Sequence, residues 1–336
     1  MHEQEFFKRV RHAGGKAYIV GGAVRDKILG KAIHDKDYVV CGLSEDVFAR
    51  TFNFPQKVGR SFPVYLLDIE DRLCEVAFAR REIKSGIGYK GFIVDFAPST
   101  SIEEDLYRRD LTVNAIASDE NGNIVDPFGG VEDIQEQTLK AVSDHFSEDP
   151  VRALRAARFS AQLGFRIDKD TLTRMRLCAP ELKLEPAERK FGELQKALGA
   201  NKPSIYFRAL HNAGLLKQEF PWIYNLIGQT QLPNHHPEGD AFEHTMISVD
   251  TTARYTECLE ARFASLVHDI GKGVTPKEIL PHHYGHDKAG LALLPEMTQT
   301  LRLPVSLAKS RELIIREHMR RKLLSNSGKM RDVFNA

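Results

Sequence analysis

The sequence lacks the features of membrane-spanning and secreted proteins. Its apolar runs fall far short of the roughly 18 residues that a membrane span needs. The first fifteen residues, MHEQEFFKRVRHAGG, mix acidic and basic side chains and contain no apolar core of the kind that a secretory signal has. We therefore expect a cytoplasmic protein without a membrane partner.

Cysteine is scarce, with four residues in a chain of 336, and no two of them have the spacing of a metal site or a redox pair. We expect reduced, mostly buried thiols. The composition is 42% hydrophobic and 28% charged, which excludes a disordered or fibrous chain and fits two or three globular domains.

Charge is balanced overall at +1 but is unevenly distributed along the chain. Residues 1–150 contain 19 basic and 26 acidic side chains, whereas residues 151–336 contain 28 basic and 20 acidic ones. An acidic first half suits metal or nucleotide chemistry, and a basic second half suits a phosphate backbone. Uneven solvated surfaces would give the same counts, so charge alone leaves both interpretations open.

The texture of the sequence changes along the chain. Up to about residue 138, short β-rich runs alternate with turns and helices, which predicts a mixed α/β region. The runs are 16–20, 37–41, 64–69, 73–79 and 123–128. From Ile134 onward the apolar spacing is helical, and QLPNHHPEGD (231–240) interrupts it. We therefore predict three domains, over residues 1–138, 139–230 and 231–336.

A pair of carboxylates marks the second β-rich run. Asp35 and Asp37 are two residues apart on a predicted strand, so their side chains leave the same face and could hold Mg²⁺. Glu75, on another predicted strand, could supply a third carboxylate to a two-metal site that activates a hydroxyl and stabilises a leaving pyrophosphate. The alternative is a solvated strand end.

A glycine pair precedes these carboxylates. Gly21 and Gly22 end a strand and precede a helix, where free backbone N–H groups can meet an anion, and Arg25 can add a charged donor. This combination suits a nucleoside triphosphate. Each motif alone is weak, because Gly-Gly is usually only a turn.

The ordered motifs resemble one family over nearly the whole chain. They are GGAVRD (21–26), DKDYVV (35–40), VGRSFPV (58–64), EEDLYRRDLTVNA (103–115), DPFGG (126–130) and EDPVRALRAARF (148–159). This series resembles the class II, bacterial CCA-adding tRNA nucleotidyltransferases. The resemblance implies an α+β chain with a polymerase-β-like head of mixed sheet and helices, then an all-α neck and body. It also implies Asp35 and Asp37 as Mg²⁺ ligands, with Gly22 and Arg25 on the triphosphate.

The segment EDPVRALRAAR carries an acceptor and donors with which a protein could distinguish bases. Asp149 and Arg152 are three apart at the start of a predicted helix, hence neighbours on its surface. An acceptor beside donors fits cytosine and adenine, which both present an amino donor next to a ring-nitrogen acceptor; an ordinary surface ion-pair helix is the alternative. The resemblance implies that this pair templates the base, and that Arg155 and Arg158 reach the triphosphate. It also implies that Arg109 contacts the nucleotide.

Eight of the thirteen histidines lie between residues 235 and 318. Such mixed nitrogen and oxygen ligands could converge on a divalent transition metal such as Ni²⁺ or Mn²⁺. The candidate ligands are His244, His268 and Asp269, with His286 and His318 as additional histidines. The segment resembles an HD phosphohydrolase domain. Such domains finish their site with a later Asp, and only Asp332 follows, so either the final ligand is missing or the chain is shortened. A working phosphohydrolase is one interpretation, and histidines that are structural or bind metal without turnover are the alternative.

Together these features predict an enzyme that adds or repairs the 3′-terminal CCA of tRNA from CTP and ATP, binds the acceptor end and releases pyrophosphate. Residues 80–92 resemble the flexible loop of enzymes that add all three nucleotides rather than CC alone. The rivals are a poly(A) polymerase, an HD phosphohydrolase with an RNA-binding head and a non-catalytic RNA-binding protein. The sequence leaves a monomer and a homodimer both open.

Overall fold

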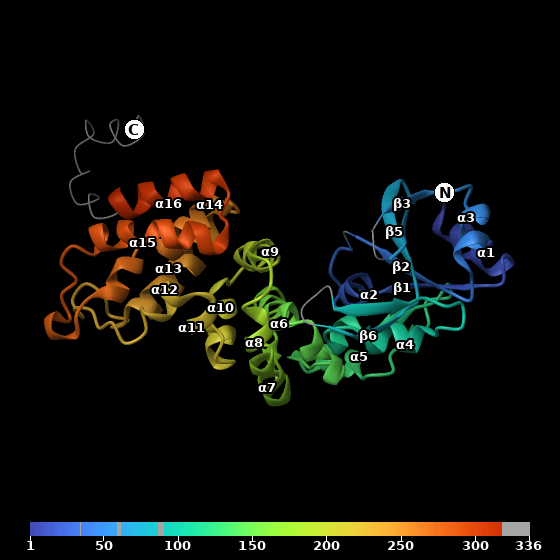
Figure 1. Cartoon of the computed structure of the whole chain (residues 1–336), viewed down its shortest axis with the longest axis horizontal. Coiled ribbons are helices and arrows are strands. Elements are labelled where there is room, and N and C mark those ends of the chain that lie inside the picture. Colours follow the sequence, from blue (N-terminus) through green and yellow to red (C-terminus); the bar gives the residue numbers. More distant parts are fainter. Residues whose placement is uncertain (34, 59–61, 87–90, 318–336) are drawn as a thin grey trace. The chain divides into compact units, whose positions relative to one another are not determined.

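A computed structural model describes residues 1–33, 35–58, 62–86 and 91–317 (Figure 1). Two compact units make up the chain. The first comprises residues 1–152 and 166–181, and the second comprises residues 153–165 and 182–336. This division differs from the three predicted domains, because residues 153–165 belong to the second unit while residues 166–181 belong to the first. The three-domain boundaries stay a prediction.

A seven-stranded sheet forms the centre of the first unit, with strand order β3-β4-β5-β2-β1-β8-β9. All neighbours are antiparallel except β2 and β5, which run parallel. The strands are β1 Lys16–Val20, β2 Asp37–Cys41, β3 Gln56–Val58, β4 Val64–Ile69, β5 Arg72–Phe78, β8 Ala117–Ser118 and β9 Ile124–Val125. The predicted runs at 16–20, 37–41, 64–69 and 73–79 are thus confirmed to within one residue. The run at 123–128 forms only β9, because the Asp126 carboxylate turns the chain by accepting hydrogen bonds from Gly130 N and Val131 N.

The helices of this unit pack on both faces of the sheet. They are α1 Glu3–His12, α2 Gly22–Ile28, α3 Glu45–Thr51, α4 Ile102–Tyr107, α5 Gly130–Gln135 and α7 Lys169–Leu177, with 3₁₀ turns at Thr112–Asn114 and Asp144–Glu148. A separate hairpin pairs β6 Arg81–Lys84 with β7 Phe92–Asp95. Residues 87–90 of the predicted flexible loop lie outside the described residues.

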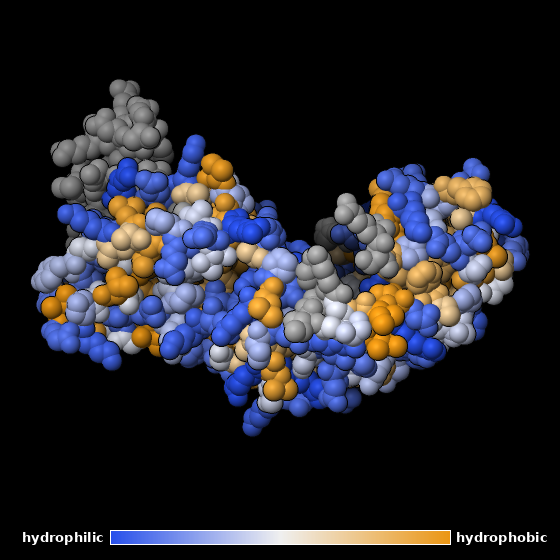
Figure 2. Space-filling model, viewed as in Figure 1, coloured by the Kyte–Doolittle hydropathy of each residue, from blue (hydrophilic) through white to orange (hydrophobic). Residues whose placement is uncertain are grey.

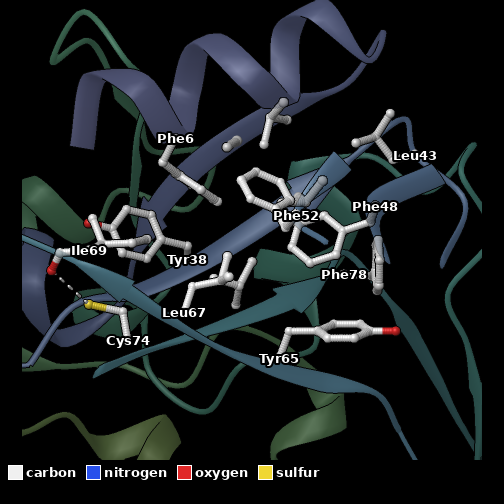
Figure 3. Packing of buried hydrophobic residues seen from close by; sticks show 14 of the residues in the cluster. Phe6, Tyr38, Leu43, Phe48, Phe52, Tyr65, Leu67, Ile69, Cys74 and Phe78 are labelled. Atoms are coloured by element: carbon white, nitrogen blue, oxygen red, sulfur yellow. Dashed lines mark hydrogen bonds between the residues drawn. The ribbon is translucent and has the colours of Figure 1, made fainter. Parts of the chain in front are cut away.

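Aromatic side chains fill the core on one face of the sheet (Figure 3). Phe6 from α1 lies edge-on to Tyr38 of β2, with ring centroids 5.0 Å apart, and Phe48 of α3 lies 5.4 Å from Phe78 of β5. Val39 belongs instead to the core on the opposite face, beside Leu106 of α4. Because side chains alternate along a strand, Asp37 shares the face of Val39 and α4. The sheet therefore turns Asp37 toward residues 108–110, the RRD motif that follows α4.

The second unit is helical. Its helices are α9 Ala187–Leu198, α10 Ser204–Asn212, α11 Leu216–Glu219, α12 Pro221–Tyr224, α13 Ala241–Tyr255, α14 Leu259–Val267, α15 His286–Leu301 and α16 Val305–Glu317, with 3₁₀ turns at Ile270–Val274 and Lys277–Ile279. Helices α6 Val151–Leu163 and α8 Ala179–Leu182 extend across the boundaries between the units. Within the second unit, α14 packs against α9, α13 and α16.

The expectation of an all-helical chain after Ile134 needs one correction. Strands β10 Thr138–Leu139 and β11 Arg166–Ile167 form a parallel pair. Two-residue strands are too short to produce the alternating pattern by which strands are recognised in a sequence.

No helix among the described residues is long and apolar enough to cross a membrane. On the face that Figure 2 shows, hydrophilic residues cover most of the surface and hydrophobic ones form separate small groups.

Candidate functional sites

Strand register brings the predicted carboxylates of the first unit together. Asp37 begins β2 and pairs in parallel register with Glu75 of β5, so the two side chains leave the same face on adjacent strands. Asp35 lies two residues before Asp37, ahead of the strand rather than within it. All three side chains are exposed at this edge. Three carboxylates that meet in this way suit a hard divalent cation such as Mg²⁺.

The surroundings of Asp37 make its carboxyl group harder to ionise than a free one, partly through repulsion by Glu75. The protein atoms around Asp37 and the neighbouring Glu75 raise the pKa of Asp37, and Asp35 adds to the effect, while the guanidinium of Arg109 opposes it. A divalent cation removes this repulsion by neutralising the negative charge. The charges of the described residues therefore favour a bound metal ion at this edge of the sheet.

The glycine pair forms the turn between β1 and α2. Gly21 has φ of +68°, a conformation that favours glycine, and its N–H is bonded to the carbonyl of Ile116, 3.0 Å away. The guanidinium of Arg25 is bonded to Asn114 Oδ1 at 2.6 Å and to Asp26 Oδ1 at 2.8 Å. Arg25 is thus held in place beside the turn, and the N–H of Gly21 is engaged by the fold.

Helix α4 positions the RRD motif. A capping box formed by Ser101 and Glu104 fixes its start. Asp105 is fully buried and pairs with Arg108 Nη2 at 2.7 Å and with Arg109 Nη2 at 3.0 Å. Although burial opposes its ionisation, the two guanidinium groups hold the pKa of Asp105 below its usual value. This ion pair directs Arg109 toward the glycine turn, where Arg109 Nη1 lies 3.4 Å from Asn114 O.

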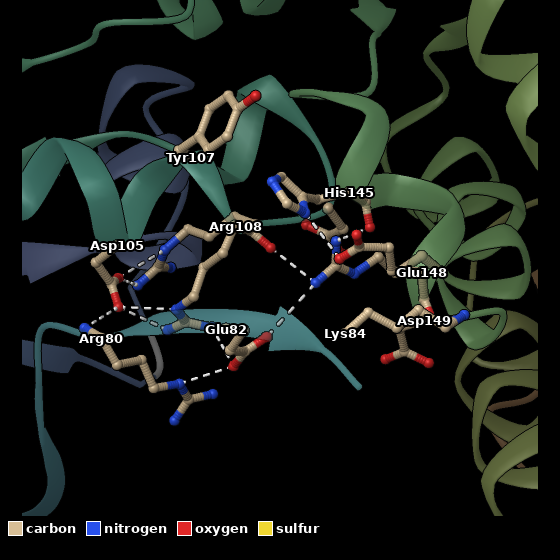
Figure 4. A network of polar contacts seen from close by, with 12 residues as sticks. Arg80, Glu82, Lys84, Asp105, Tyr107, Arg108, His145, Glu148 and Asp149 are labelled. Carbon is tan, nitrogen blue, oxygen red and sulfur yellow. Dashed lines mark hydrogen bonds and ion pairs between the residues drawn. The ribbon is translucent and has the colours of Figure 1, made fainter. Parts of the chain in front are cut away.

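The two residues predicted to select the base, Asp149 and Arg152, occupy different positions from those predicted. Asp149 lies two residues before α6 in an extended conformation, and Arg152 is only 8% exposed. Arg152 donates to the carbonyls of His145 at 2.8 Å and Arg108 at 2.7 Å (Figure 4). Its side chain is therefore buried among backbone acceptors rather than on the helix surface, a difference that the local spacing of three cannot reveal.

A polar network surrounds this pair (Figure 4). Arg108 donates to Glu82 Oε1 at 3.1 Å as well as to Asp105. Lys84 of the same hairpin donates to the carbonyl of Glu148 at 3.0 Å. The β6–β7 hairpin is thus tied to both the RRD motif and the segment before α6.

The remaining arginines of α6 belong to the second unit. Arg158 is 6% exposed, donates to Glu193 Oε2 at 2.5 Å, and lies over the ring of Phe159 at 3.9 Å. Arg155 lies 5.5 Å from the same ring. The role of both arginines on a triphosphate stays a prediction.

A second candidate metal centre lies in the helical unit around Asp269. The Nε2 atoms of three histidines face its carboxylate from different helices, and Asp269 itself is 2% exposed. The distances are 3.7 Å from His244 on α13, 3.2 Å from His268 at the end of α14, and 3.5 Å from His286 at the start of α15. The predicted convergence of His244, His268 and Asp269 agrees with these positions, whereas His318 lies outside the described residues.

The chemistry of these donors fits a transition metal. Imidazole nitrogens with one carboxylate oxygen are the ligands of such ions. Burial lowers the pKa of His244, against the opposing charge of Asp269, so its imidazole is neutral near pH 7 and can act as a ligand. Lys272, 6% exposed, lies with its Nζ 2.6 Å from Asp269 Oδ2.

Sequence reasoning missed Glu238. Its Oε1 lies 2.5 Å from His244 Nδ1 and 3.2 Å from Nδ1 of His236, which is half-buried. The signal in the sequence is the HHPE run, six residues ahead of His244, in a segment that was treated only as a break between domains.

Three family models match successive parts of the chain. They are a poly A polymerase head domain over residues 17–140, a probable RNA and SrmB-binding site of polymerase A over 164–226, and an HD domain over 241–332. The multifunctional CCA protein of Methylococcus capsulatus is 45% identical over 309 residues, which are 90% of this chain and 72% of that protein. The multifunctional CCA protein of Mannheimia succiniciproducens is 43% identical over 90% of this chain and 74% of its own length.

Solved structures give the same fold. The Bacillus stearothermophilus CCA-adding enzyme in complex with CTP is 26% identical with a TM-score of 0.56, and the match covers 94% of this chain and 81% of that one. Another CCA-adding enzyme, without ligand, has a TM-score of 0.65 at 21% identity over 96% of this chain and 81% of its own.

Proposed function

The chain belongs to the family of multifunctional CCA proteins, which makes it a CCA-adding tRNA nucleotidyltransferase, and we propose which of its residues carry that reaction. We assign Asp35, Asp37 and Glu75 to the metal ions that bind the incoming nucleotide and the tRNA 3′ end. The observation that supports this most strongly is the parallel register that sets Glu75 beside Asp37. We take the ions to be Mg²⁺, since the donors are all carboxylate oxygens.

In the proposed reaction the 3′-hydroxyl oxygen of tRNA bonds to the α-phosphorus of CTP or ATP, and the bond to pyrophosphate breaks. Divalent ions held by the carboxylates would supply the charge that favours hydroxyl ionisation and stabilises the leaving group. Arg109, directed by Asp105, and Arg25, held by Asn114, contact the triphosphate from the glycine turn. Gly22 allows the triphosphate to approach that turn closely.

The base is chosen by Asp149 and Arg152. Burial of Arg152 against two carbonyls fixes its guanidinium, so a base with the wrong donor pattern leaves polar groups unpaired, which costs about 1–3 kcal/mol per group. We also assign Arg155 and Arg158 of α6 to the triphosphate, and the basic second half of the chain to the tRNA acceptor end. Binding to tRNA then weakens steeply with salt, as for any contact made mainly to phosphates.

The helical unit supports a second candidate activity. Three imidazoles around a buried Asp269 fit a transition ion that activates water against a phosphoester, such as a 2′,3′-cyclic phosphate or a 2′-phosphate. We propose Ni²⁺ or Mn²⁺ as the ion.

A nucleotide-incorporation assay tests the main proposal. tRNA transcripts that end before CCA, CA or A are incubated with Mg²⁺ and with CTP and ATP singly and together, using the wild type and the Asp35→Ala/Asp37→Ala variant. Ordered addition of C, C and A that stops, and that disappears in the variant, supports the assignment. Long tails from ATP alone would instead indicate a poly(A) polymerase, and incorporation that survives in the variant would remove the carboxylates from the mechanism.

A further inference from the structure

Each imidazole that faces Asp269 is held at its other nitrogen by a second partner. His268 Nδ1 lies 2.8 Å from the carbonyl of Ser265, and His286 Nδ1 lies 2.7 Å from the carbonyl of His283. Both partners accept hydrogen bonds only, so a proton on Nδ1 of each imidazole satisfies these contacts and leaves Nε2 free to bind a metal ion beside Asp269. An outer hydrogen bond of this kind fixes the tautomer and orientation of a metal-binding histidine.

His244 differs from the other two in the nature of its outer partner. Its Nδ1 faces the carboxylate of Glu238, whose side chain is 15% exposed, rather than a backbone carbonyl. A carboxylate accepts a stronger hydrogen bond than a neutral carbonyl and raises the basicity of the imidazole. His244 also has the longest distance to Asp269 of the three, 3.7 Å, so its orientation depends most on what holds it from behind.

The segment that carries Glu238 is closed by its own backbone. Gln231 N donates to Gly239 O, and Gly239 N donates to His236 O, each at 2.9 Å. An isolated bridge between Thr230 and Asp240 closes the base of the same loop. Residues 230–240 therefore form a compact loop that presents Glu238 to His244, rather than a simple linker between domains.

We propose that Glu238 is a positioning residue of the helical metal centre, which fixes His244 with its proton on Nδ1 so that Nε2 faces Asp269. The affinity of this unit for a divalent transition metal then depends on a side chain outside the ligand set. The inference rests on the proposed metal site, and it assigns a function to the loop of residues 230–240. His236, whose Nδ1 lies 3.2 Å from Glu238 Oε1, steadies the same carboxylate from its other side.

A second set of residues near His244 also has the chemistry to bind a metal ion. His236, Glu238 and His244 could themselves hold an ion, because their ligand atoms lie within 4.8 Å of one another. That arrangement requires His244 Nδ1 to lose its proton. The separation of 2.5 Å between Glu238 and His244 is a hydrogen-bond distance, which favours the positioning role.

Calorimetric titration of the full-length chain with Ni²⁺ tests the proposal. The Asp35→Ala/Asp37→Ala background removes two of the three carboxylates of the candidate Mg²⁺ site in the first unit. We expect one tight site, weakened about 10–100-fold by Glu238→Ala and less by Glu238→Gln, whose amide oxygen still accepts a hydrogen bond. Glu243→Gln is the matched control, because Glu243 lies on the same helix as His244 but pairs with Arg208. Unchanged affinity in Glu238→Ala, or two tight sites in the parent, would overturn the proposal.

The tautomer of His244 gives a readout that does not require metal. Long-range ¹H–¹⁵N spectra of the histidine-labelled, metal-free chain, with His244→Gln to assign the signal, should show the proton on Nδ1. Glu238→Ala should remove this preference and leave the other imidazoles unchanged. A proton on Nε2 in the parent would disprove the positioning role even if metal binds. Absence of Ni²⁺ binding together with the Nδ1 tautomer would instead contradict the proposed metal site, and with it the role of Glu238 in metal affinity.

Discussion

The two candidate metal centres are built in different ways. In the first unit, Asp37 and Glu75 are exposed carboxylates whose spacing is set by backbone pairing of β2 with β5. In the second unit, Asp269 and His286 are 2% and 7% exposed, and side chains from several helix ends converge there. Exposed oxygen ligands on the face of a sheet suit Mg²⁺ with a bulky triphosphate, whereas buried nitrogen ligands suit a transition ion and a small phosphoester.

The difference shows which kind of site a sequence reveals. In a site on adjacent strands, the register alone decides which side chains meet, because side chains alternate between the two faces of a strand. A site between helices needs every ligand oriented by something behind it, such as Glu238 behind His244. The helical centre is therefore expected to be more sensitive to changes outside its ligands.

The strongest test of this comparison uses two variants, each of which should lose the activity of one site and keep that of the other. Asp37→Ala should reduce nucleotide incorporation about 1000-fold or more, since metal stabilisation of the transition state amounts to several kcal/mol. It should leave hydrolysis of a 2′,3′-cyclic phosphate unchanged. Asp269→Asn should do the reverse. Steady-state assays of both reactions measure the effects, with Asp68→Asn as the control, because Asp68 is an exposed carboxylate on β4 of the same sheet.

A single variant that lost both activities would show that the two centres do not act separately. If Asp37→Ala retained more than a tenth of the incorporation rate, Asp37 would not hold the metal ion of this reaction.

The sequence predicted the strands around the candidate site of the first unit because that information is local. Runs 16–20 and 37–41 are strands with the expected bounds, and the order of Gly21, Asp37 and Glu75 along the chain already suggested one cluster. The parallel register of β2 with β5 was not predictable, because it depends on packing between segments more than thirty residues apart.

One local inference failed and one residue was missed, for a related reason. Arg152 has the spacing of a surface helix residue, yet it is buried because the carbonyls of Arg108 and His145 fold over it. Glu238 carries no periodic signal, since its importance comes from a loop that closes on itself and brings it to His244. Both depend on contacts that only the folded chain supplies.

The buried ion pair behind Arg109 should dominate the stability of the first unit near its site. Asp105→Asn leaves Arg108 and Arg109 without their buried carboxylate and should lower the free energy of unfolding by about 3–5 kcal/mol, measured by urea denaturation at pH 7. Because the guanidinium groups lower the pKa of Asp105, its contribution is complete above about pH 4 and is lost as the pH falls through the folded value. The variant should lack this part of the acid dependence.

Glu5→Gln is the control for this variant, because Glu5 also pairs with an arginine four residues away but on the exposed face of α1. Its unfolding curve should match that of the wild type. Equal curves for Asp105→Asn and Glu5→Gln would show that burial of the pair does not matter.

The smallest effects are expected from the residues that cap one helix beside each centre, and each cap should affect only its own centre. Ser101 caps α4, which carries Asp105 and so directs Arg109, while Asp240 caps α13, which carries His244. Ser101→Ala and Asp240→Ala should each reduce stability by about 0.5–2 kcal/mol, measured by thermal unfolding. Ser101→Ala should also raise KM for CTP without changing Ni²⁺ affinity, and Asp240→Ala should weaken Ni²⁺ binding without changing KM. Both caps act on helix ends rather than on ligands. If Ser101→Ala weakened Ni²⁺ binding, or Asp240→Ala raised the KM for CTP, helix position would not be what orients the two centres.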